Sequence, residues 1–246
     1  MKVNKTTAWF EDWFNSPYYH ILYKHRNTTE AKQFIDNLIE KLHIQQGSRI
    51  LDLACGRGRH SVYLAQLGFD VTGADLSQKN IDFARQFEHE TLSFKVHDMR
   101  HTLEHEGFDY LLNMFTSFGY FDDEEDNHAT FKAIAQNLKP GGVAVIDFLN
   151  AEKTKRKLIE NEEKEVSDIL FQITREYVDG AIIKHINFND GGTPYHYREK
   201  VQALSLNDFE KYSSFAGLEL VNVYGGYTLQ PFDPYDADRM IVVLKK

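Results

Sequence analysis

The chain has 246 residues, of which 42% are hydrophobic and 26% charged, and its formal net charge is −9. This length and composition predict a globular protein built on one large α/β domain. The acidic balance disfavours nucleic acid and anionic membranes as partners, because both are bound by clustered Lys and Arg. No run approaches the roughly 20 apolar residues of a membrane helix, and the chain begins without the apolar stretch of a signal peptide, so we expect a cytoplasmic protein.

Cysteine and histidine content gives no sign of a metal site. Cys55 is the only cysteine, so no disulfide can form within the chain and zinc sites built from two or more thiolates are excluded. His97, His101 and His105 recur at intervals of four residues, a spacing that on one helix builds a metal face. Because this segment contains a strand end and a loop, the three side chains would not share a face. We expect no bound metal.

Helical and strand-like patterns alternate from about residue 29 to residue 149. Apolar positions from Ala31 to Leu42 follow one helical face, Gly68 ends a second helix, and Ser77 caps a third. Five apolar runs predict strands at residues 49–54, 70–74, 92–97, 108–115 and 143–149, and the turn at residues 139–142 stops the helix before the fifth strand. This order predicts an α/β fold with a doubly wound, Rossmann-like parallel sheet.

The pattern changes after residue 165. Runs at 171–177, 181–189 and 194–203 are separated by Asp-Gly turns that predict hairpins, so we expect a small antiparallel sheet at residues 165–204, inserted after strand five. The mixed charges of residues 153–164 predict an exposed helix or lid stem. A helix capped by Ser205 follows, and the last apolar runs lie at 218–224 and 240–244.

The residues that carry chemistry begin at the end of the first predicted strand. Asp52 is followed by the small residues Ala54 and Cys55 and by a G-x-G turn at Gly56 and Gly58. In a doubly wound sheet, ligands bind at the carboxyl ends of the strands, and glycines let the backbone approach them closely. Alone, this turn is a weak signal, because a tight strand-to-helix turn also occurs without a ligand.

Two further acids lie where a nucleoside would need them. Asp75 ends the second strand, 23 residues after Asp52, where a carboxylate accepts hydrogen bonds from both ribose hydroxyls. Asp98 ends the third strand, where it can accept from an exocyclic adenine amine. Three strand-end acids in register indicate a ligand site rather than surface decoration.

These residues resemble the class I S-adenosylmethionine-dependent methyltransferases. The resembling segments are DLACGRGRH for motif I, GADLS for motif II, HDM for motif III, FDYLLNMFTSFGYF for motif IV with its loop, and LKPGGVAVIDF around strand five. Their order and spacing over about residues 29–150 make the resemblance specific. The chain departs from the family at Ala54 and His60, where many members have glycine.

The resemblance implies a seven-stranded sheet in a single domain of residues 1–246, with an N-terminal helical lid at residues 1–28. It implies S-adenosylmethionine as cofactor and S-adenosylhomocysteine as product. The implied cofactor contacts are Asp52, Ala54, Cys55, Gly56 and Gly58 at the methionine moiety, Asp75 at the ribose, Asp98 and Met99 at the adenine, and Leu76 and Phe115 beside them.

The acceptor is expected to be a small molecule methylated at N or O. The segment at residues 113–118 lacks the (Asp/Asn)-Pro-Pro-(Tyr/Phe) loop of amino-methylating DNA enzymes. The acceptor would contact Tyr19 in the lid, Arg198 in the insert, and Tyr227 and Tyr235 in the loop at residues 225–238. The lid aromatics also have a plainer reading, in which they only pack the helix on the domain. We expect a monomer or a homodimer.

Methyl transfer is an in-line displacement, so the protein needs no nucleophile of its own. A base is required only when the acceptor must lose a proton, and the candidates are His20, Tyr120, Asp122 and His196. Two alternatives remain at this point. A nicotinamide-dependent oxidoreductase would use the same glycine turn, although Asp52 would repel a pyrophosphate there, and a non-catalytic binding protein could retain the fold.

Overall fold

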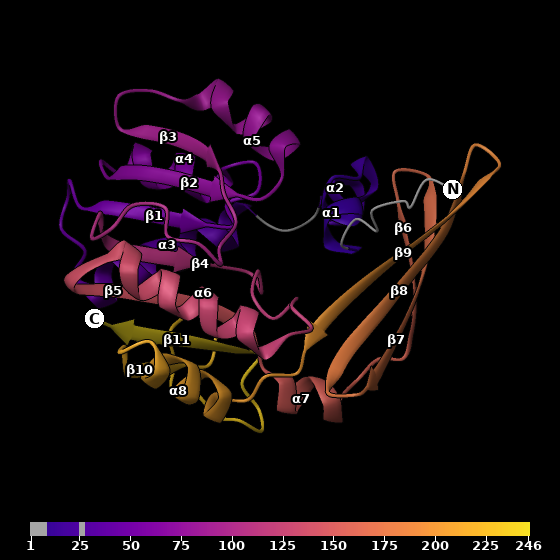
Figure 1. Cartoon of the computed structure of the whole chain (residues 1–246). Coiled ribbons are helices and arrows are strands. Elements are labelled where there is room, and N and C mark those ends of the chain that lie inside the picture. The colour runs from indigo at the N-terminus through magenta and orange to yellow at the C-terminus, as the bar shows by residue number, and fades with distance from the viewer. Residues whose placement is uncertain (1–8, 25–27) are drawn as a thin grey trace, which may run out of the picture.

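The computed structural model describes residues 9–24 and 28–246, which form two separate sheets (Figure 1). The core sheet has seven strands in the order β10-β11-β5-β4-β1-β2-β3. The strands β1 to β5 run parallel, whereas β11 is antiparallel to both β5 and β10. The core strands are β1 Arg49–Leu53, β2 Asp70–Asp75, β3 Leu92–Val96, β4 Phe108–Asn113, β5 Leu138–Leu149, β10 Glu219–Tyr224 and β11 Arg239–Lys245. The predicted doubly wound, Rossmann-like fold is confirmed.

Strand β5 begins five residues earlier than its apolar run predicts. Its first residue, Leu138, pairs with Phe108, but the register then shifts so that Val143 pairs with Tyr110. The turn residues at 139–142 therefore bulge out of the ladder, after a helix that ends at Asn137 as predicted.

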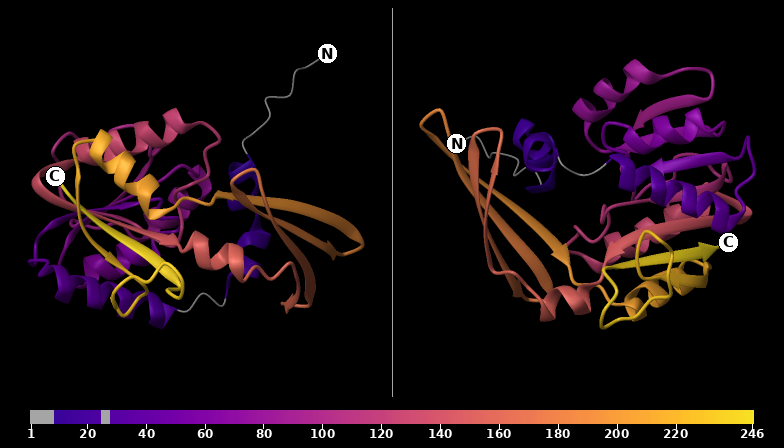
Figure 2. Two further views of the ribbon diagram at one scale, coloured as in Figure 1. Left: turned by 90° about the horizontal axis from the view of Figure 1, so that it is seen from below. Right: turned by 180° about the vertical axis from the view of Figure 1, so that it is seen from behind.

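Helices cover both faces of the core sheet (Figures 1 and 2). One face packs on α3 Thr28–Leu42, α4 Arg59–Gln66 and α5 Gln78–Ala84, and the other on α6 Glu124–Asn137 and α8 Leu206–Phe215. The 3-10 turn η1 Arg85–Phe87 follows α5 and has no buried residue. Phe34 and Leu38 of α3 are fully buried on the first face, and Phe131 and Phe209 on the second. The inner strands β1 and β2 are therefore buried on both sides, which explains their continuous apolar runs, whereas the edge strand β3 alternates between buried and exposed residues.

The insert is a four-stranded antiparallel sheet with the order β6-β7-β8-β9. It follows helix α7 Ala151–Arg156 and comprises β6 Asn161–Val166, β7 Ile169–Val178, β8 Ala181–Asp190 and β9 Thr193–Gln202. The inserted sheet confirms the prediction, but the expectation of a helix or stem up to residue 164 is wrong from Asn161 onward. Strand β6 has the sequence NEEKEV and pairs only with β7, at the edge of the insert. Charged residues are common on edge strands, so no apolar alternation marks this strand in the sequence.

Two short helices, α1 Trp9–Phe14 and α2 Pro17–Leu22, lie between the insert and the core (Figure 1). The buried side chains of Trp13 and Leu22 pack with Phe171, Ile186 and Phe188 of the insert to form a small third core. The predicted lid at residues 1–28 also includes residues 1–8 and 25–27, which lie outside the described residues.

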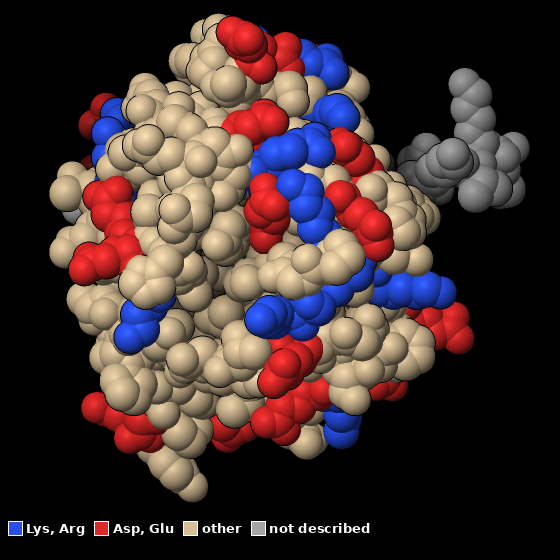
Figure 3. Space-filling model, turned by 90° about the vertical axis from the view of Figure 1, so that its left-hand side faces the viewer, with Lys and Arg blue, Asp and Glu red and all other residues tan. Residues whose placement is uncertain are grey.

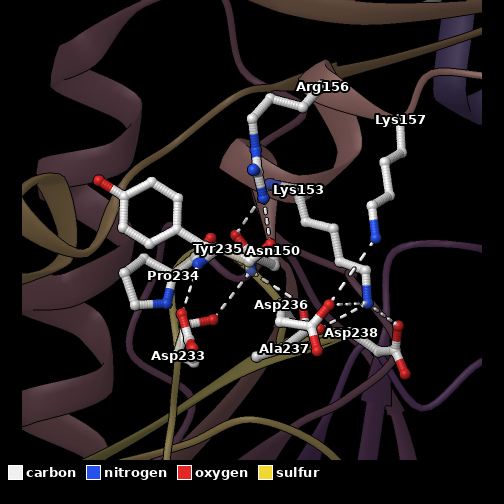
Figure 4. Close-up of polar contacts among 10 residues, drawn as sticks. All are labelled: Asn150, Lys153, Arg156, Lys157, Asp233, Pro234, Tyr235, Asp236, Ala237 and Asp238. Atoms are coloured by element: carbon white, nitrogen blue, oxygen red, sulfur yellow. Dashed lines mark hydrogen bonds and ion pairs between the residues drawn. The ribbon is translucent and has the colours of Figure 1, made fainter.

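The loop between β10 and β11 is tied to the start of the insert (Figure 4). Asn150 caps α7 and donates its amide to the carbonyls of Pro234 at 3.0 Å and Ala237 at 2.8 Å. Lys153 donates to the Asp238 carboxylate at 2.6 Å and to the carbonyl of Asp236. The loop is thereby held against the point where the chain leaves the core.

The amino ends of the parallel strands carry charges of both signs (Figure 3). Arg49 lies 3.1 Å from Glu104 and 3.4 Å from Asp70, and Lys139 lies 2.8 Å from Asp109. This face offers no uninterrupted basic surface. Among the residues that the structure describes, no helix is long and apolar enough to cross a membrane.

Replacing Gly58 with alanine should lower the free energy of unfolding by about 2–4 kcal/mol, measured by urea denaturation. Gly58 has φ 78°, and a Cβ there would lie 2.5 Å from the ring of the buried Phe94. Gly191→Ala is the matched control, because Gly191 has φ 56° but no neighbour within 4 Å of an added Cβ. Equal losses in the two variants would show that the contact with Phe94 is not the cause.

Candidate functional site

A cavity of about 1090 Å³ lies at the carboxyl ends of the parallel strands, under the N-terminal helices and the insert. Its floor comes from the turns that follow β1 to β4, and its roof from the N-terminal helices and strands β8 and β9. The predicted cofactor residues on its wall are Asp52, Ala54, Cys55, Gly56, Asp75, Leu76, Asp98, Met99 and Phe115, joined by Tyr19, His20, Tyr120 and Tyr227 from the other predicted sets. The parallel arrangement of the strands brings these segments together.

Asp52 is the most deeply buried acid on the floor, with 1% of its surface exposed. Its Oδ2 accepts a hydrogen bond from the Ser61 hydroxyl of α4 at 2.6 Å. Burial, and to a smaller extent the charge of Asp75, raise the pKa of Asp52 to about 6. The carboxylate is therefore ionised at neutral pH at a cost in stability, which a cationic ligand group would offset.

Asp75 holds the glycine turn in place. One carboxylate oxygen accepts from the Gly56 amide and the other from the Ser77 amide, each at 2.9 Å. Burial nevertheless raises the pKa of Asp75 above its ordinary value. Ala54, in the same turn, has φ 64°, a left-handed conformation that explains why a glycine is common at this position in similar proteins.

Asp98 differs from the first two acids because it has a basic partner. Arg100 donates to its carboxylate at 2.6 Å and also reaches Asp126 of α6 at 3.1 Å. Burial would raise the pKa of Asp98, but the hydrogen bonds and charge of Arg100 outweigh it and hold that pKa below its ordinary value. Asp98 is therefore an ionised hydrogen-bond acceptor at the end of β3.

An aromatic wall closes one side of the cavity. Phe115 stacks on His60 with ring centroids 5.0 Å apart and planes at 2°, and it contacts Tyr227 at 5.4 Å. Burial, followed by the charge of Arg59, lowers the pKa of His60 to about 3, so this ring is neutral. In the sequence His60 is only a departure from a glycine motif, and nothing there predicts its stacking on Phe115.

The roof contains an ion pair from the insert that sequence reasoning missed. Lys184 of β8 lies 3.3 Å from Glu199 of β9, with only 14% and 18% of the two side chains exposed. Glu199 also accepts from the Trp13 indole and the Tyr23 hydroxyl, each at 2.6 Å. Beside this group, burial and the charge of Arg57 lower the pKa of His20 to about 4. His20 is therefore neutral above that pH.

Several predicted residues do not line the cavity. His196 and Arg198 lie on the opposite face of β9 from Glu199, because successive side chains of a strand alternate between its faces. Tyr235 is 69% exposed and lies under the Arg156 guanidinium. The exposed Asp122 pairs with Lys200 instead of facing the cavity. Gly58 packs on Phe94, behind the turn. A strict two-residue alternation from the partly buried Tyr195 and Tyr197 of β9 would have identified Glu199.

The hydrogen-bond acceptors and negative charges of the cavity fit S-adenosylmethionine. Asp52, Asp75 and Asp98 present hydrogen-bond acceptors and negative charge, which suit an ammonium group, ribose hydroxyls and an adenine amine. A pyrophosphate in the same turn would face the carboxylates of Asp52 and Asp75, and this repulsion disfavours a dinucleotide. Within residues 9–24 and 28–246, no three His, Cys, Asp or Glu side chains are grouped so as to hold a metal ion.

Comparisons with known proteins agree with this geometry. The model of the family described as "Methyltransferase domain" matches residues 50–142. A crystal structure of an S-adenosylmethionine-dependent methyltransferase from Clostridium acetobutylicum superposes with a TM-score of 0.77, covering 93% of this chain and 95% of that one at 21% identity. Residues 50–142, which carry the glycine turn and the acids Asp52, Asp75 and Asp98, thus match a methyltransferase domain, and the fold is that of S-adenosylmethionine-dependent methyltransferases.

Two curated relatives show how far the likeness extends. The cypemycin N-terminal methyltransferase of a Streptomyces species is 26% identical over 81% of this chain and 84% of its own length. The ubiquinone biosynthesis O-methyltransferase of Cereibacter sphaeroides is 39% identical, but the match covers only 43% of this chain and 42% of that protein. This second match spans less than half of this chain and less than half of the O-methyltransferase.

Asp52→Asn should raise the free energy of unfolding of the ligand-free protein more at pH 7.5 than at pH 4, and the difference between the two effects should be about 2 kcal/mol. The folded-state pKa of Asp52 is raised, so in the wild type this group lowers the free energy of unfolding as pH rises from about 4 to about 6. Urea denaturation at the two pH values measures the difference. Asp109→Asn is the opposite control, because the lowered pKa of Asp109 predicts a loss of stability at the higher pH. Equal effects of Asp52→Asn at both pH values would contradict this account.

Asp75→Ala should weaken the binding of S-adenosylhomocysteine by about 10–100-fold in calorimetry, because two charge-assisted contacts are lost. Asp75→Asn retains one acceptor oxygen and should lose less. Asp70→Ala is the matched control, since Asp70 begins the same strand at its opposite end and pairs with Arg49. Unchanged affinity in Asp75→Ala would exclude this carboxylate from the binding site.

Proposed function

We propose that this methyltransferase transfers the methyl group of S-adenosylmethionine to a nitrogen atom of a small-molecule amine. The observation that carries the proposal is a single cavity that joins three strand-end acids to a roof built from the N-terminal helices and the insert. The first part suits the cofactor and the second suits an acceptor. Because both face one space, donor and acceptor can meet at attack distance.

The floor residues hold the cofactor in this proposal. Asp52 faces its ammonium group, Asp75 the ribose hydroxyls, and Asp98 with Met99 the adenine, while Phe115 provides an apolar surface beside it. Bound S-adenosylmethionine supplies an electrophilic methyl group on a sulfonium. Fixing the two reactants in line can contribute roughly 7–11 kcal/mol to lowering the barrier without a protein nucleophile.

The roof favours an acceptor that becomes cationic during the reaction. A neutral amine gains positive charge as its nitrogen bonds to the methyl carbon and the carbon–sulfur bond breaks. Tyr19 and Phe14 line this end of the cavity as aromatic residues that suit such a charge, while the Tyr23 ring beside them faces the Lys184 ammonium group. His20 is neutral above about pH 4, so it does not repel the sulfonium. His20 is the remaining candidate for receiving the ammonium proton, because the Tyr120 hydroxyl donates its own proton to the carbonyl of Thr116.

The comparisons support nitrogen over oxygen as the acceptor atom. The cypemycin N-terminal methyltransferase matches 81% of this chain. Because the match is this long, the likeness extends well beyond the core. The O-methyltransferase matches over 43% of this chain. Since the roof, rather than the cofactor floor, contacts the acceptor, the longer match is the more informative.

Incubation with methyl-labelled S-adenosylmethionine and a panel of small amines tests the proposal. The panel contains amino sugars, amino acids and short peptides with free amino termini, each paired with the analogue in which a hydroxyl replaces the amine. We expect label on at least one amine and none on its hydroxyl partner, with Asp75→Ala reducing the rate. Label on hydroxyl compounds alone would refute N-methylation, and binding of NADH without binding of S-adenosylhomocysteine would refute the cofactor assignment.

A further inference from the structure

The chain after β4 is held in an unfavourable backbone conformation. Phe115 and Thr116 have φ angles of 60° and 58°, so two consecutive residues with side chains adopt the left-handed conformation. This conformation normally belongs to single glycines, because Cβ approaches the following carbonyl oxygen. Thr116 is in addition β-branched and 9% exposed. Such strain persists only where surrounding contacts fix the backbone, and it is concentrated at functional sites.

Asp147, near the carboxyl end of β5, fixes this turn. Its carboxylate Oδ2 accepts from the Phe115 amide at 2.8 Å, and its backbone carbonyl accepts from the Thr116 amide at 2.9 Å. The Tyr120 hydroxyl donates to the carbonyl of Thr116 from the other side. Both strained residues are therefore held by hydrogen bonds of their own backbone.

Arg239, the first residue of β11, connects Asp147 to the turn. Its Nε lies 2.7 Å from Asp147 Oδ1, and its Nη2 donates to Thr116 Oγ1 at 2.8 Å. The antiparallel ladder pairs Arg239 with Leu149 and Ile241 with Asp147, which places the guanidinium beside the carboxylate. Because Asp147 is 0% exposed, its charge requires this partner.

The turn formed by Phe115 and Thr116 is part of the cavity wall. Phe115, Thr116 and Arg239 all line the cavity, and the Phe115 ring is the one that stacks on His60. Tyr227 contacts the same ring and places its hydroxyl 3.3 Å from Asp147 Oδ2. A change in φ at residues 115 and 116 would therefore move the aromatic wall as well as the backbone.

We propose that Arg239 is a positioning residue: together with Asp147 it holds Phe115 and Thr116 in the left-handed conformation and so sets the affinity of the cavity for S-adenosylmethionine. This inference rests on the proposed function in one respect, that the cofactor lies against Phe115. Arg239 acts through the turn and takes no part in the methyl transfer itself.

Arg239→Met tests the proposal by two measurements on the full chain. Calorimetry with S-adenosylhomocysteine should give a Kd at least about 10-fold higher than that of the wild type. Hydrogen exchange of the ligand-free protein should become at least about 10-fold faster at the amides of Phe115 and Thr116, with no comparable change at Leu112 of β4. If Arg239→Met does not fold, Arg239→Lys retains the charge beside Asp147 and cannot reproduce both contacts, and it should show smaller changes in the same directions.

Rescue and a matched control separate positioning from general stability. Adding Thr116→Gly to Arg239→Met should recover a large part of the lost affinity, because glycine adopts a positive φ without the Cβ cost. Lys139→Met breaks the ion pair with Asp109 near the start of the same β5 strand, and it should lower the melting temperature without changing the Kd.

Each outcome decides between the two proposals. Wild-type affinity and unchanged exchange in Arg239→Met, with a lowered melting temperature alone, would show that Arg239 only stabilises the fold and would overturn the inference. Failure of the wild type to bind S-adenosylhomocysteine would instead refute the cofactor site, and the exchange rates at Phe115 and Thr116 would still decide whether Arg239 holds the turn.

Discussion

The structure depends on the desolvation of carboxylates at one edge of a parallel sheet. Asp52, Asp75 and Asp147 all lie where strands end or where the sheet is fully covered, so each loses most of its hydration. Only Asp147 has an adjacent guanidinium, supplied by Arg239. Asp52 has a serine hydroxyl, and Asp75 has two backbone amides. The same fold thus contains one buried acid, Asp147, whose charge is balanced by an arginine. The raised pKa values of Asp52 and Asp75 indicate that their hydrogen bonds compensate only in part for the loss of hydration.

The sequence predicted the parts of the fold that local patterns determine. Apolar runs marked the inner parallel strands because helices cover both sides of the sheet there, and the edge strand β3 was marked by its alternation of apolar and polar residues. Ser77 and Ser205 marked helix starts, since both are N-caps in the structure. Asp52, Asp75 and Asp98 were predicted to meet because the carboxyl ends of neighbouring parallel strands share one edge. That inference needs only strand order, not side-chain detail.

What the sequence did not predict depends on register and on distant pairing. The sequence predicted Arg198, whereas the cavity is lined by its neighbour Glu199, because in a strand one position exchanges the two faces. Strand β6 gave no signal because both of its faces are polar. The Asp147–Arg239 pair joins residues 92 positions apart across an antiparallel strand, so spacing could not reveal it. The only hint was a single aspartate within the apolar run VAVIDFL.

The inserted sheet is continuous in sequence, and its four strands pair only with their chain neighbours. It leaves the core after β5 and returns before α8, so none of the parallel strands depends on it for hydrogen bonding. Mutations in the insert can therefore reshape the roof while the floor is preserved. The roof and the floor of the cavity thus belong to different hydrogen-bond ladders, so a substitution in β8 or β9 leaves the ladder that carries Asp52 and Asp75 intact.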